Sequence, residues 1–497
     1  MKRFTKFLKV LVRNRRGLLG LTILIFFAIL AVVAPLLTPY DPLAIGQGIA
    51  GDFVYPSWFK YLPGNEKLSE NVQPINDAGF TTEKALQEWT FTTIPSGQSP
   101  SREFISDVGS PIGNPGCIAI SFKRDQTEAT SEVEAFLTKE FYYPYQGPPK
   151  RFLGKVYVKV IGVKNLTQWG YVEIKVFIEQ TEGQRYDLWS AKQGGNYISE
   201  IWITPSIEGT NQYPPLIDSN LLDPKGQIFS KQGTFFKQGN YRYGVEVVFT
   251  QDVQEATVYI DDLDLRLYGT VFGFLGTDEL GRDLFTQLLY GARISMIIGL
   301  SAAFLSVSIG LILGLFSGYL GKIVDELIMR FTDMFLVLPE LPLLIVLIAV
   351  LGPTVWNQVI TIGFLGWMGF ARVVRSQVLS LKERPFVEAG KALGGGKLHI
   401  IGRHILPNVM NLVYVTLAMA VPYAIMSEAY VSFLGLFDPT IMTWGRMLHN
   451  ALEQPSGVER WWWIVPPGLC IAAISTSFIL IGYALDEILN PKIRERR

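Results

Sequence analysis

The chain has 497 residues, of which 49% are apolar and only 18% are charged, and its mean hydropathy is +0.25. Its 44 Lys and Arg residues balance 44 Asp and Glu residues, which excludes a nucleic-acid partner bound through bulk positive charge. Two cysteines and three histidines leave little material for a disulfide framework or a metal site. Soluble proteins carry about 25% charged residues, so this composition indicates a membrane protein with a soluble part.

The chain begins with a basic segment and continues with an apolar one. Residues 1–16 contain seven Lys and Arg residues and no acid, and residues 17–37 contain no charge at all. A run of about 20 apolar residues is long enough to span a bilayer. A cleaved signal peptide is the alternative, but Pro35 directly follows the best cleavage site and would hinder a peptidase. We therefore expect 1–16 to be cytoplasmic and 17–37 to be the first transmembrane helix.

Residues 38–275 lack the apolar runs and instead alternate between polar and apolar residues. The alternation has period two in 155–160 and 171–178, which is typical of half-buried strands. In 255–268 the phase of the alternation changes at Asp261–Asp262, which predicts a β-bulge or a tight corner. Short strands separated by Gly and Pro favour an inserted all-β domain, either a sandwich or a jelly roll.

Residues 276–497 return to the membrane pattern. They contain five apolar runs, and with the first helix these make six expected transmembrane helices. The five runs are 286–317, 327–351, 354–371, 409–436 and 461–483.

The distribution of basic residues predicts the orientation of these helices. Residues 372–403 contain seven Lys and Arg residues but only two acids, and the tail 492–497 is also basic. Cytoplasmic loops of membrane proteins carry an excess of Lys and Arg. Six spans with both termini in the cytoplasm fit every loop, and they place the 38–275 insert outside the cell.

A search for catalytic motifs is negative. Gly394–Lys397 resembles the end of a phosphate-binding loop, but Lys391 stands where that motif needs its first Gly, and Leu398 follows where it needs Ser or Thr. We therefore expect no enzyme activity and no cofactor in this chain. Any energy source has to come from a partner.

The loop 380–407 in the basic cytoplasmic segment has the pattern of two short helices joined by a glycine turn. Ala389, Ala392 and Leu393 share one helical face, which is small and apolar enough to enter a groove on another protein. Gly394 suits a helix C-terminus with positive φ, and Pro407 suits the first turn of the next helix. An ordinary amphipathic connector is the alternative interpretation.

This loop resembles the EAA motif of ABC importer permeases. Glu388-Ala389, Gly394 and His404-Ile-Leu-Pro407 match the pattern, while Gly390 and His404 depart from its general form. The Arg-His-Ile-Leu-Pro-Asn sequence is familiar in the dipeptide/oligopeptide branch of that family. Further segments resemble the C-type permease of this branch, namely 275–283, 290–295, 428–436 and 443–448.

The resemblance covers 1–45 and about 272–497, and it implies the type I ABC importer permease fold in a prokaryotic plasma membrane. It also implies a B-type permease partner, two ABC ATPase subunits that use ATP and Mg, and an external solute-binding protein. The implied substrates are oligopeptides, dipeptides or oligosaccharides. The implied residues for coupling to the ATPases are Glu388, Ala389, Ala392, Leu393, Gly394, His404, Leu406 and Pro407.

Two acids lie within the expected spans, where charge is expensive and often functional. Glu340 and Glu428 are therefore candidates for the translocation path or its gate. For each acid the alternative is a structural pairing with an Arg or a backbone amide of the partner permease, and we favour this for Glu428. Arg330 and Asp333, three residues apart, are expected to form a local ion pair.

The resemblance says nothing about the insert. Its last strand pattern is similar to that of carbohydrate-binding jelly rolls, and four tryptophans are candidates for stacking on sugars, although filling the core is the more common use of such residues. A membrane-anchored carbohydrate-binding or adhesion protein is thus the alternative to a transporter subunit. The four residues are Trp58, Trp169, Trp189 and Trp202.

Overall fold

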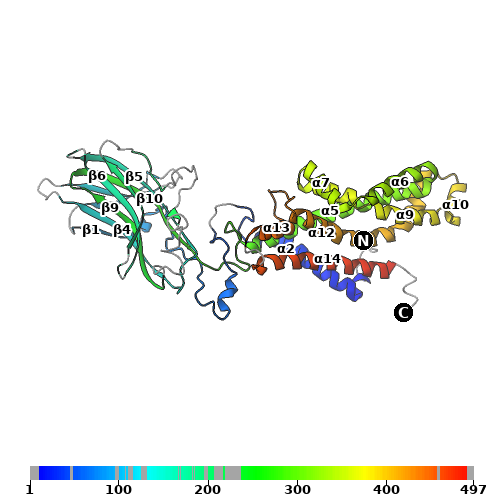
Figure 1. Ribbon diagram of the computed structural model, residues 1–497, viewed down its shortest axis with the longest axis horizontal. Coiled ribbons are helices and arrows are strands. Elements are labelled where there is room, and N and C mark those ends of the chain that lie inside the picture. Colours follow the sequence, from blue (N-terminus) through cyan, green and yellow to red (C-terminus); the bar gives the residue numbers. More distant parts are fainter. Residues whose placement is uncertain are drawn as a thin grey trace. The chain divides into compact units, whose positions relative to one another are not determined.

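The computed structural model divides the chain into two compact units, which are described separately. The first consists of Met1–Gln47 and Arg282–Arg497, and the second is the insert, Gly48–Gly281. The first unit is a set of apolar helices and the second a β-sheet region (Figure 1). The basic ends 1–9 and 490–497 lie outside the described residues. The structure describes residues 10–44, 49–95, 100–106, 108–109, 116–124, 131–165, 167, 169–181, 183, 185–194, 200–205, 217–218, 237–455 and 459–489.

Within the described residues of the helical unit, four helices are long and apolar enough to cross a membrane. They are α2 (Arg15–Leu37), α5 (Leu284–Leu320), the continuous helix Lys397–Phe433 and α14 (Trp461–Leu489). The number rises to six if each of two bent helix pairs forms one span.

The two bent pairs lie between α5 and the coupling-loop segment. α6 (Lys322–Val337) and α7 (Glu340–Leu351) meet at 93°, and α8 (Val355–Leu365) and α9 (Met368–Leu381) meet at 43°. Leu338 is extended, as expected for a residue that precedes a proline. The sequence patterns had predicted a single kinked span from 327 to 351, so the size of the bend at Leu338–Pro339 is a finding of the structure.

Glycines allow α5 to pack closely against α9. Gly310, Gly314 and Gly318 lie four residues apart on α5, and a Cβ atom on each would lie within 3.0 Å of α9 or of the residue before it. At Gly314 the nearest atoms would be Cβ of Val374, at 2.6 Å, and the carbonyl oxygen of Ala371, at 2.7 Å. Small residues at a helix interface are how membrane helices approach without a hydrophobic driving force.

The ion pairs of α6 differ from the expected one between Arg330 and Asp333. Arg330 pairs with Glu326, one turn earlier on α6, and Asp333 pairs with Arg372 of α9. The prediction was wrong because α9 packs against α6 and offers Asp333 a more distant partner. A second ion pair between α6 and α9 is bidentate. Arg375 donates to both oxygens of Asp325, each at 2.5 Å, and a bidentate pair is stronger than a single hydrogen bond.

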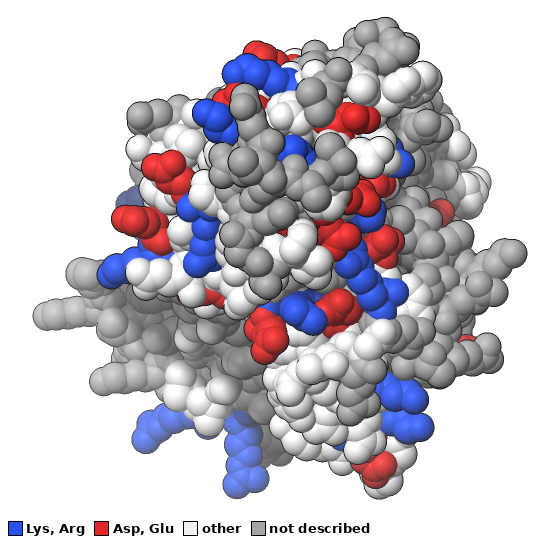
Figure 2. Space-filling model, turned by 90° about the vertical axis from the view of Figure 1, so that its left-hand side faces the viewer, with Lys and Arg blue, Asp and Glu red and all other residues white. Residues whose placement is uncertain are grey.

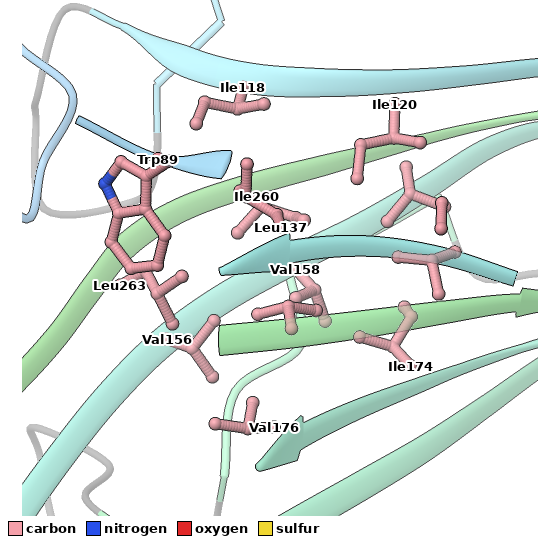
Figure 3. Packing of buried hydrophobic residues seen from close by; sticks show 14 of the residues in the cluster. Trp89, Ile118, Ile120, Leu137, Val156, Val158, Ile174, Val176, Ile260 and Leu263 are labelled. Carbon is pink, nitrogen blue, oxygen red and sulfur yellow. The ribbon is translucent and has the colours of Figure 1, made fainter. Parts of the chain in front are cut away.

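In the described part of the insert, two antiparallel five-stranded sheets enclose one hydrophobic core. Their strand orders are β1-β4-β9-β6-β7 and β2-β3-β10-β5-β8. Side chains of both sheets belong to this core, for example Val176 of β6 and Val156 of β5 (Figure 3). The strands are β1 (Thr90–Ile94), β2 (Ser101–Ile105), β3 (Cys117–Lys123), β4 (Val133–Tyr143), β5 (Arg151–Asn165), β6 (Tyr171–Gln180), β7 (Arg185–Gly194), β8 (Ile217–Asp218), β9 (Gly239–Phe249) and β10 (Val253–Tyr268).

The predicted bulge in the last strand is confirmed. The register of β10 against β5 shifts between Asp261 and Asp264, and Asp262 has φ +51°. The shift lets apolar residues on both sides of the bulge enter the same core, including Ile260 and Leu263.

The two ends of the insert are tied to each other. Tyr55 forms a parallel bridge with Val271, and Phe53 donates its N–H to the carbonyl of Asp278 at 2.9 Å. The Thr277 hydroxyl donates to Gly51 at 2.6 Å. The insert therefore leaves and rejoins the helical unit through paired segments.

Both units contain further helices, most of them short. The insert contains η1 (Ser57–Tyr61) and α3 (Glu83–Gln87), and the helical unit contains α10 (Pro385–Ala392), α11 (Lys397–Ile400), the π-helical turn η2 (Ile401–Ile405), α12 (Leu406–Phe433) and α13 (Trp444–Glu453).

Candidate functional site

The first half of the coupling loop is a short helix anchored at one point. α10 begins with Pro385, and the preceding Arg384 is extended, as a residue before proline should be. Val387 is fully buried in the hydrophobic cluster that also holds Ile400 and Ile405. Glu388, the next residue, is exposed. One apolar anchor thus fixes a helix whose other side faces outward.

The end of α10 is a Schellman motif. Gly394 donates its N–H to the carbonyl of Lys391 at 2.9 Å, and Gly395 donates to the carbonyl of Gly390 at 3.1 Å. Gly394 has φ +82°, so the predicted positive φ is confirmed. This conformation is unfavourable for other L-residues, and it fixes the turn between α10 and α11.

The exposed side of this turn is apolar and small. Ala389 and Ala392 are exposed, the Leu393 side chain is 89% exposed, and Leu398 of α11 is 72% exposed. Exposed apolar groups gathered in this way mark interaction surfaces. We call Ala389, Ala392, Leu393 and Leu398 the tip of the coupling loop.

The second half of the loop differs from the expectation that Pro407 opens a new helix. The helix already begins at Lys397 and continues to Phe433. Pro407 cannot donate an N–H, and the turn before it is π-helical, with Leu406 donating to Ile401. The carbonyl of His404 accepts a further hydrogen bond from the Asn408 side chain at 2.7 Å. Side-chain and π-helical hydrogen bonds thus carry the helix through the proline.

The two departures from the EAA pattern face each other. A Cβ atom on Gly390 would lie 3.0 Å from Cδ1 of Ile400 and 3.2 Å from Nε2 of His404. An alanine would therefore crowd the imidazole. In the sequence the departures at Gly390 and His404 look independent, but in the structure the two residues pack against each other.

A cavity of about 390 Å³ lies beside the α6–α7 break. Its walls come from α5, α6, α7, α8, α9 and α12, and they include Glu340, Tyr423, Ser306 and Thr416. The Tyr423 hydroxyl donates to Oε1 of Glu340. The sequence analysis selected Glu340 but missed Tyr423, because a tyrosine in an apolar span shows no partner in the sequence.

The second acid, Glu428, is completely buried in this chain. Its oxygens accept hydrogen bonds from Ser432, at 2.8 Å, and from Ser295 of α5, at 3.2 Å. The Ser295 hydroxyl also accepts the N–H of Trp444 at the start of α13. Hydroxyl groups of this chain thus bind Glu428 and join α5, α12 and α13, and the expected pairing with an Arg or amide of the partner permease stays a prediction. Glu428 is not among the described residues that line the cavity beside Glu340.

The four candidate tryptophans lie on four different segments of the insert. Trp189 packs against the core, Trp58 donates its indole N–H to the carbonyl of Phe274 at 3.0 Å, and Trp202 is half-buried. Trp169 is 76% exposed. On the face shown in Figure 2, charges of both signs are interspersed rather than gathered in one patch. Across the described part of the chain, no cluster of three or more His, Cys, Asp or Glu side chains is placed to hold a metal ion.

Two family models match the chain on either side of the insert. Residues 310–495 match the binding-protein-dependent transport system inner membrane component. Residues 3–56 match the N-terminal TM domain of oligopeptide transport permease C.

Curated relatives match somewhat less than half of this chain. The dipeptide transport system permease protein DppC of Bacillus subtilis is 38% identical over 223 residues, which are 44% of this chain and 69% of the relative. The oligopeptide transport system permease protein OppC of Haemophilus influenzae is 40% identical over 225 residues, which are 45% of this chain and 71% of the relative.

Likeness to solved structures is weak. A chain of the MetNI methionine ABC transporter is 15% identical, with 42% of this chain and 96% of that chain covered and a TM-score of 0.31. A structure of carbohydrate-binding modules from the β-sandwich superfamily is 9% identical, with 44% and 63% covered and a TM-score of 0.23.

Proposed function

Since this chain belongs to the C-type permeases of binding-protein-dependent oligopeptide and dipeptide transport, we propose that it imports peptides as one of two membrane subunits of its transporter. It is a multi-pass inner-membrane permease subunit of an ABC importer and not itself an enzyme. The importer contains further subunits. We propose that these are a B-type permease, two ATPases that bind ATP and Mg, and an external solute-binding protein.

The proposed mechanism rests mainly on the exposure of the tip of the coupling loop. Leu393 is 89% exposed although it follows a helix that is anchored through the buried Val387. A rigid turn that presents apolar side chains to a partner can transmit a movement of that partner to α12, because Lys397–Phe433 is one continuous helix. The coupling residues Glu388 to Pro407 then transmit force and do no chemistry.

The proposed topology has six spans, with each bent helix pair counted as one span. Both termini and the coupling loop are cytoplasmic and the insert is extracytoplasmic, because the basic residues favour this orientation. The pair of permeases alternates between inward-facing and outward-facing states. The cavity beside Glu340 belongs to the path, and Glu428 holds α5, α12 and α13 together.

Peptides are favoured over oligosaccharides as substrates because the relatives are named for dipeptide and oligopeptide transport. We propose a jelly-roll sandwich for the insert on the basis of its two facing sheets. Trp189 packs on the core and Trp58 is half-buried, whereas Trp169 is 76% exposed and keeps its ring available for stacking on a sugar. The alternative of a membrane-anchored adhesion or carbohydrate-binding protein is not favoured, because the helical unit matches permease family models.

The test is ATP hydrolysis by the purified importer in the presence of its external binding protein. Peptide is expected to stimulate hydrolysis and oligosaccharide is not. Leu393→Asp should abolish the stimulation, whereas Ile201→Asp, at a position of the insert that is 63% exposed, should leave it unchanged. If no ATPase accompanies the purified chain, or if Leu393→Asp is as active as the unaltered protein, the proposed mechanism is wrong.

A further inference from the structure

We propose that the cavity beside the α6–α7 break binds a cationic group, and that Glu340 receives the protonated α-amino group of a peptide in transit. This inference rests on the proposed import of peptides. It assigns a ligand to a place within the permease itself, separate from the binding protein that delivers the substrate.

The cavity has the size of a small-molecule site. Its volume of about 390 Å³ lies within the range of ~300–1,000 Å³ that is usual for small-molecule sites. Much of its wall consists of small residues, which leave the space open beside the carboxylate. These are Ala302, Ala303, Gly366, Gly369, Ala420 and Ala424.

Within the described part of the chain, Glu340 is the one charged residue among those that line the cavity. The Tyr423 hydroxyl donates to Oε1, and Oε2 has no hydrogen-bond partner among the described residues. A hydroxyl group orients a carboxylate but does not neutralise its charge. Glu340 is exposed in this chain, and a carboxylate within a membrane-spanning segment is stabilised most by a cation.

Three arginines of the neighbouring helices α6 and α9 are already paired with acids. Arg330 of α6 pairs with Glu326, and Arg372 of α9 pairs with Asp333. Arg375 donates to both oxygens of Asp325. The cation that Glu340 can receive therefore has to come from outside these pairs.

The break between the helices explains why the carboxylate is held at this place. Pro339 is extended, and Glu340 lies in the first turn of α7, where the unpaired N–H groups of the helix favour a negative charge. Its side chain meets Tyr423 of α12, 83 residues further along the chain. The carboxylate is thus fixed from two directions at the wall of the cavity.

A primary ammonium group suits this arrangement. It carries three donors, so it can reach Oε2 of Glu340 and also donate to the hydroxyl oxygens of Ser306 or Thr416, which line the same cavity. An uncharged sugar gains no charge-assisted hydrogen bond from the carboxylate. The site therefore selects for peptides with a free amino terminus.

The first test compares uptake of two probes, trialanine and N-acetyl-trialanine, by the complete importer in proteoliposomes with its binding protein. Glu340→Gln is expected to lower the maximal rate for trialanine at least tenfold and to leave the rate for the acetylated peptide within twofold. Glu326→Gln is the matched control, because Glu326 is an exposed acid of α6 that lies outside the cavity. It should change neither rate.

The second test locates the amino group directly. A carbodiimide that joins amines to carboxylates is applied during trialanine turnover, and the adduct is mapped by mass spectrometry. The expected adduct is on Glu340 with trialanine and absent with the acetylated peptide. An unaltered importer that takes up trialanine without this adduct would overturn the inference.

The remaining outcomes are distinct. Equal loss of both uptake rates in Glu340→Gln, or no loss in either, overturns the inference and leaves peptide import standing. Failure of Glu340→Gln to assemble with the second permease also overturns it, because the acid then serves a neighbouring subunit. If the unaltered importer takes up neither peptide, the proposed import of peptides is itself wrong.

Discussion

The glycine turn of the coupling loop provides the sharpest prediction about coupling. At Gly394 the backbone has φ +82°, and a Cβ atom added there would have no heavy atom within 4 Å. Replacing Gly394 by Val therefore creates no clash. Any effect must come from the backbone conformation and from the hydrogen bonds that depend on it.

The size of the effect can be worked out from this geometry. A left-handed conformation costs an ordinary L-residue roughly 1–2 kcal/mol, and strained residues in general cost about 1–3 kcal/mol. If the turn relaxes instead, the loop loses the two hydrogen bonds of the Schellman motif, each worth about 0.5–1.5 kcal/mol. Either way the present turn becomes roughly 5- to 30-fold less populated relative to other conformations.

Two further substitutions in the same loop separate the effect of backbone conformation from the effect of side-chain size. Asn accepts a left-handed conformation, so Gly394→Asn should be much milder. Gly396 has φ −67° and also has open space around its Cβ position, so Gly396→Val should be nearly silent.

The assay is ATP hydrolysis and peptide uptake by the assembled importer, measured as peptide molecules imported per ATP. Gly394→Val should insert into the membrane normally but lose at least fivefold in this ratio. The reasoning is refuted if Gly394→Val couples as well as the unaltered protein, or if Gly396→Val is equally harmful.

Three further predictions follow from packing and burial. Gly390→Ala should reduce uptake, and adding His404→Ile should restore it, with a coupling of about 0.5–3 kcal/mol in a double-mutant cycle; independent effects would contradict the contact. Gly314→Leu should cost about 1–3 kcal/mol by overpacking and lower the melting temperature of the helical unit, whereas Gly468→Leu, with open space around it, should not. Burial raises the pKa of the Cys117 thiol to about 12, so iodoacetamide at pH 8 should leave it unmodified until the insert is unfolded; rapid labelling of Cys117 in the native protein, mapped apart from Cys470, would contradict this.

Features that depend on neighbouring residues in the chain could be predicted from the sequence. The change of phase at Asp261–Asp262 required a bulge, and the structure has one. Gly394 was placed correctly at a positive φ because the helix pattern ends there. The membrane character of the chain follows from its apolar runs, and the family follows from the motifs of the coupling loop.

Features that depend on contacts between distant elements could not be predicted. Tyr423 is 83 residues from Glu340, and Ser295 is 133 residues from Glu428, so no local pattern links them. The pairing expected for Arg330 failed for the same reason, since the partner of the neighbouring acid comes from α9. The 93° angle between α6 and α7 is a further feature of this kind. A proline predicts that a helix is interrupted, but it does not predict the angle of the break.

Site-specific photo-crosslinking from position 393 in the assembled importer tests the central claim most directly. A photoreactive phenylalanine replaces Leu393, and the same residue replaces Tyr61 of the insert, which is 77% exposed, as the control. We predict an adduct between position 393 and an ATPase subunit, and none from position 61. ATPase adducts that form from other cytoplasmic positions while position 393 captures no ATPase would contradict the account.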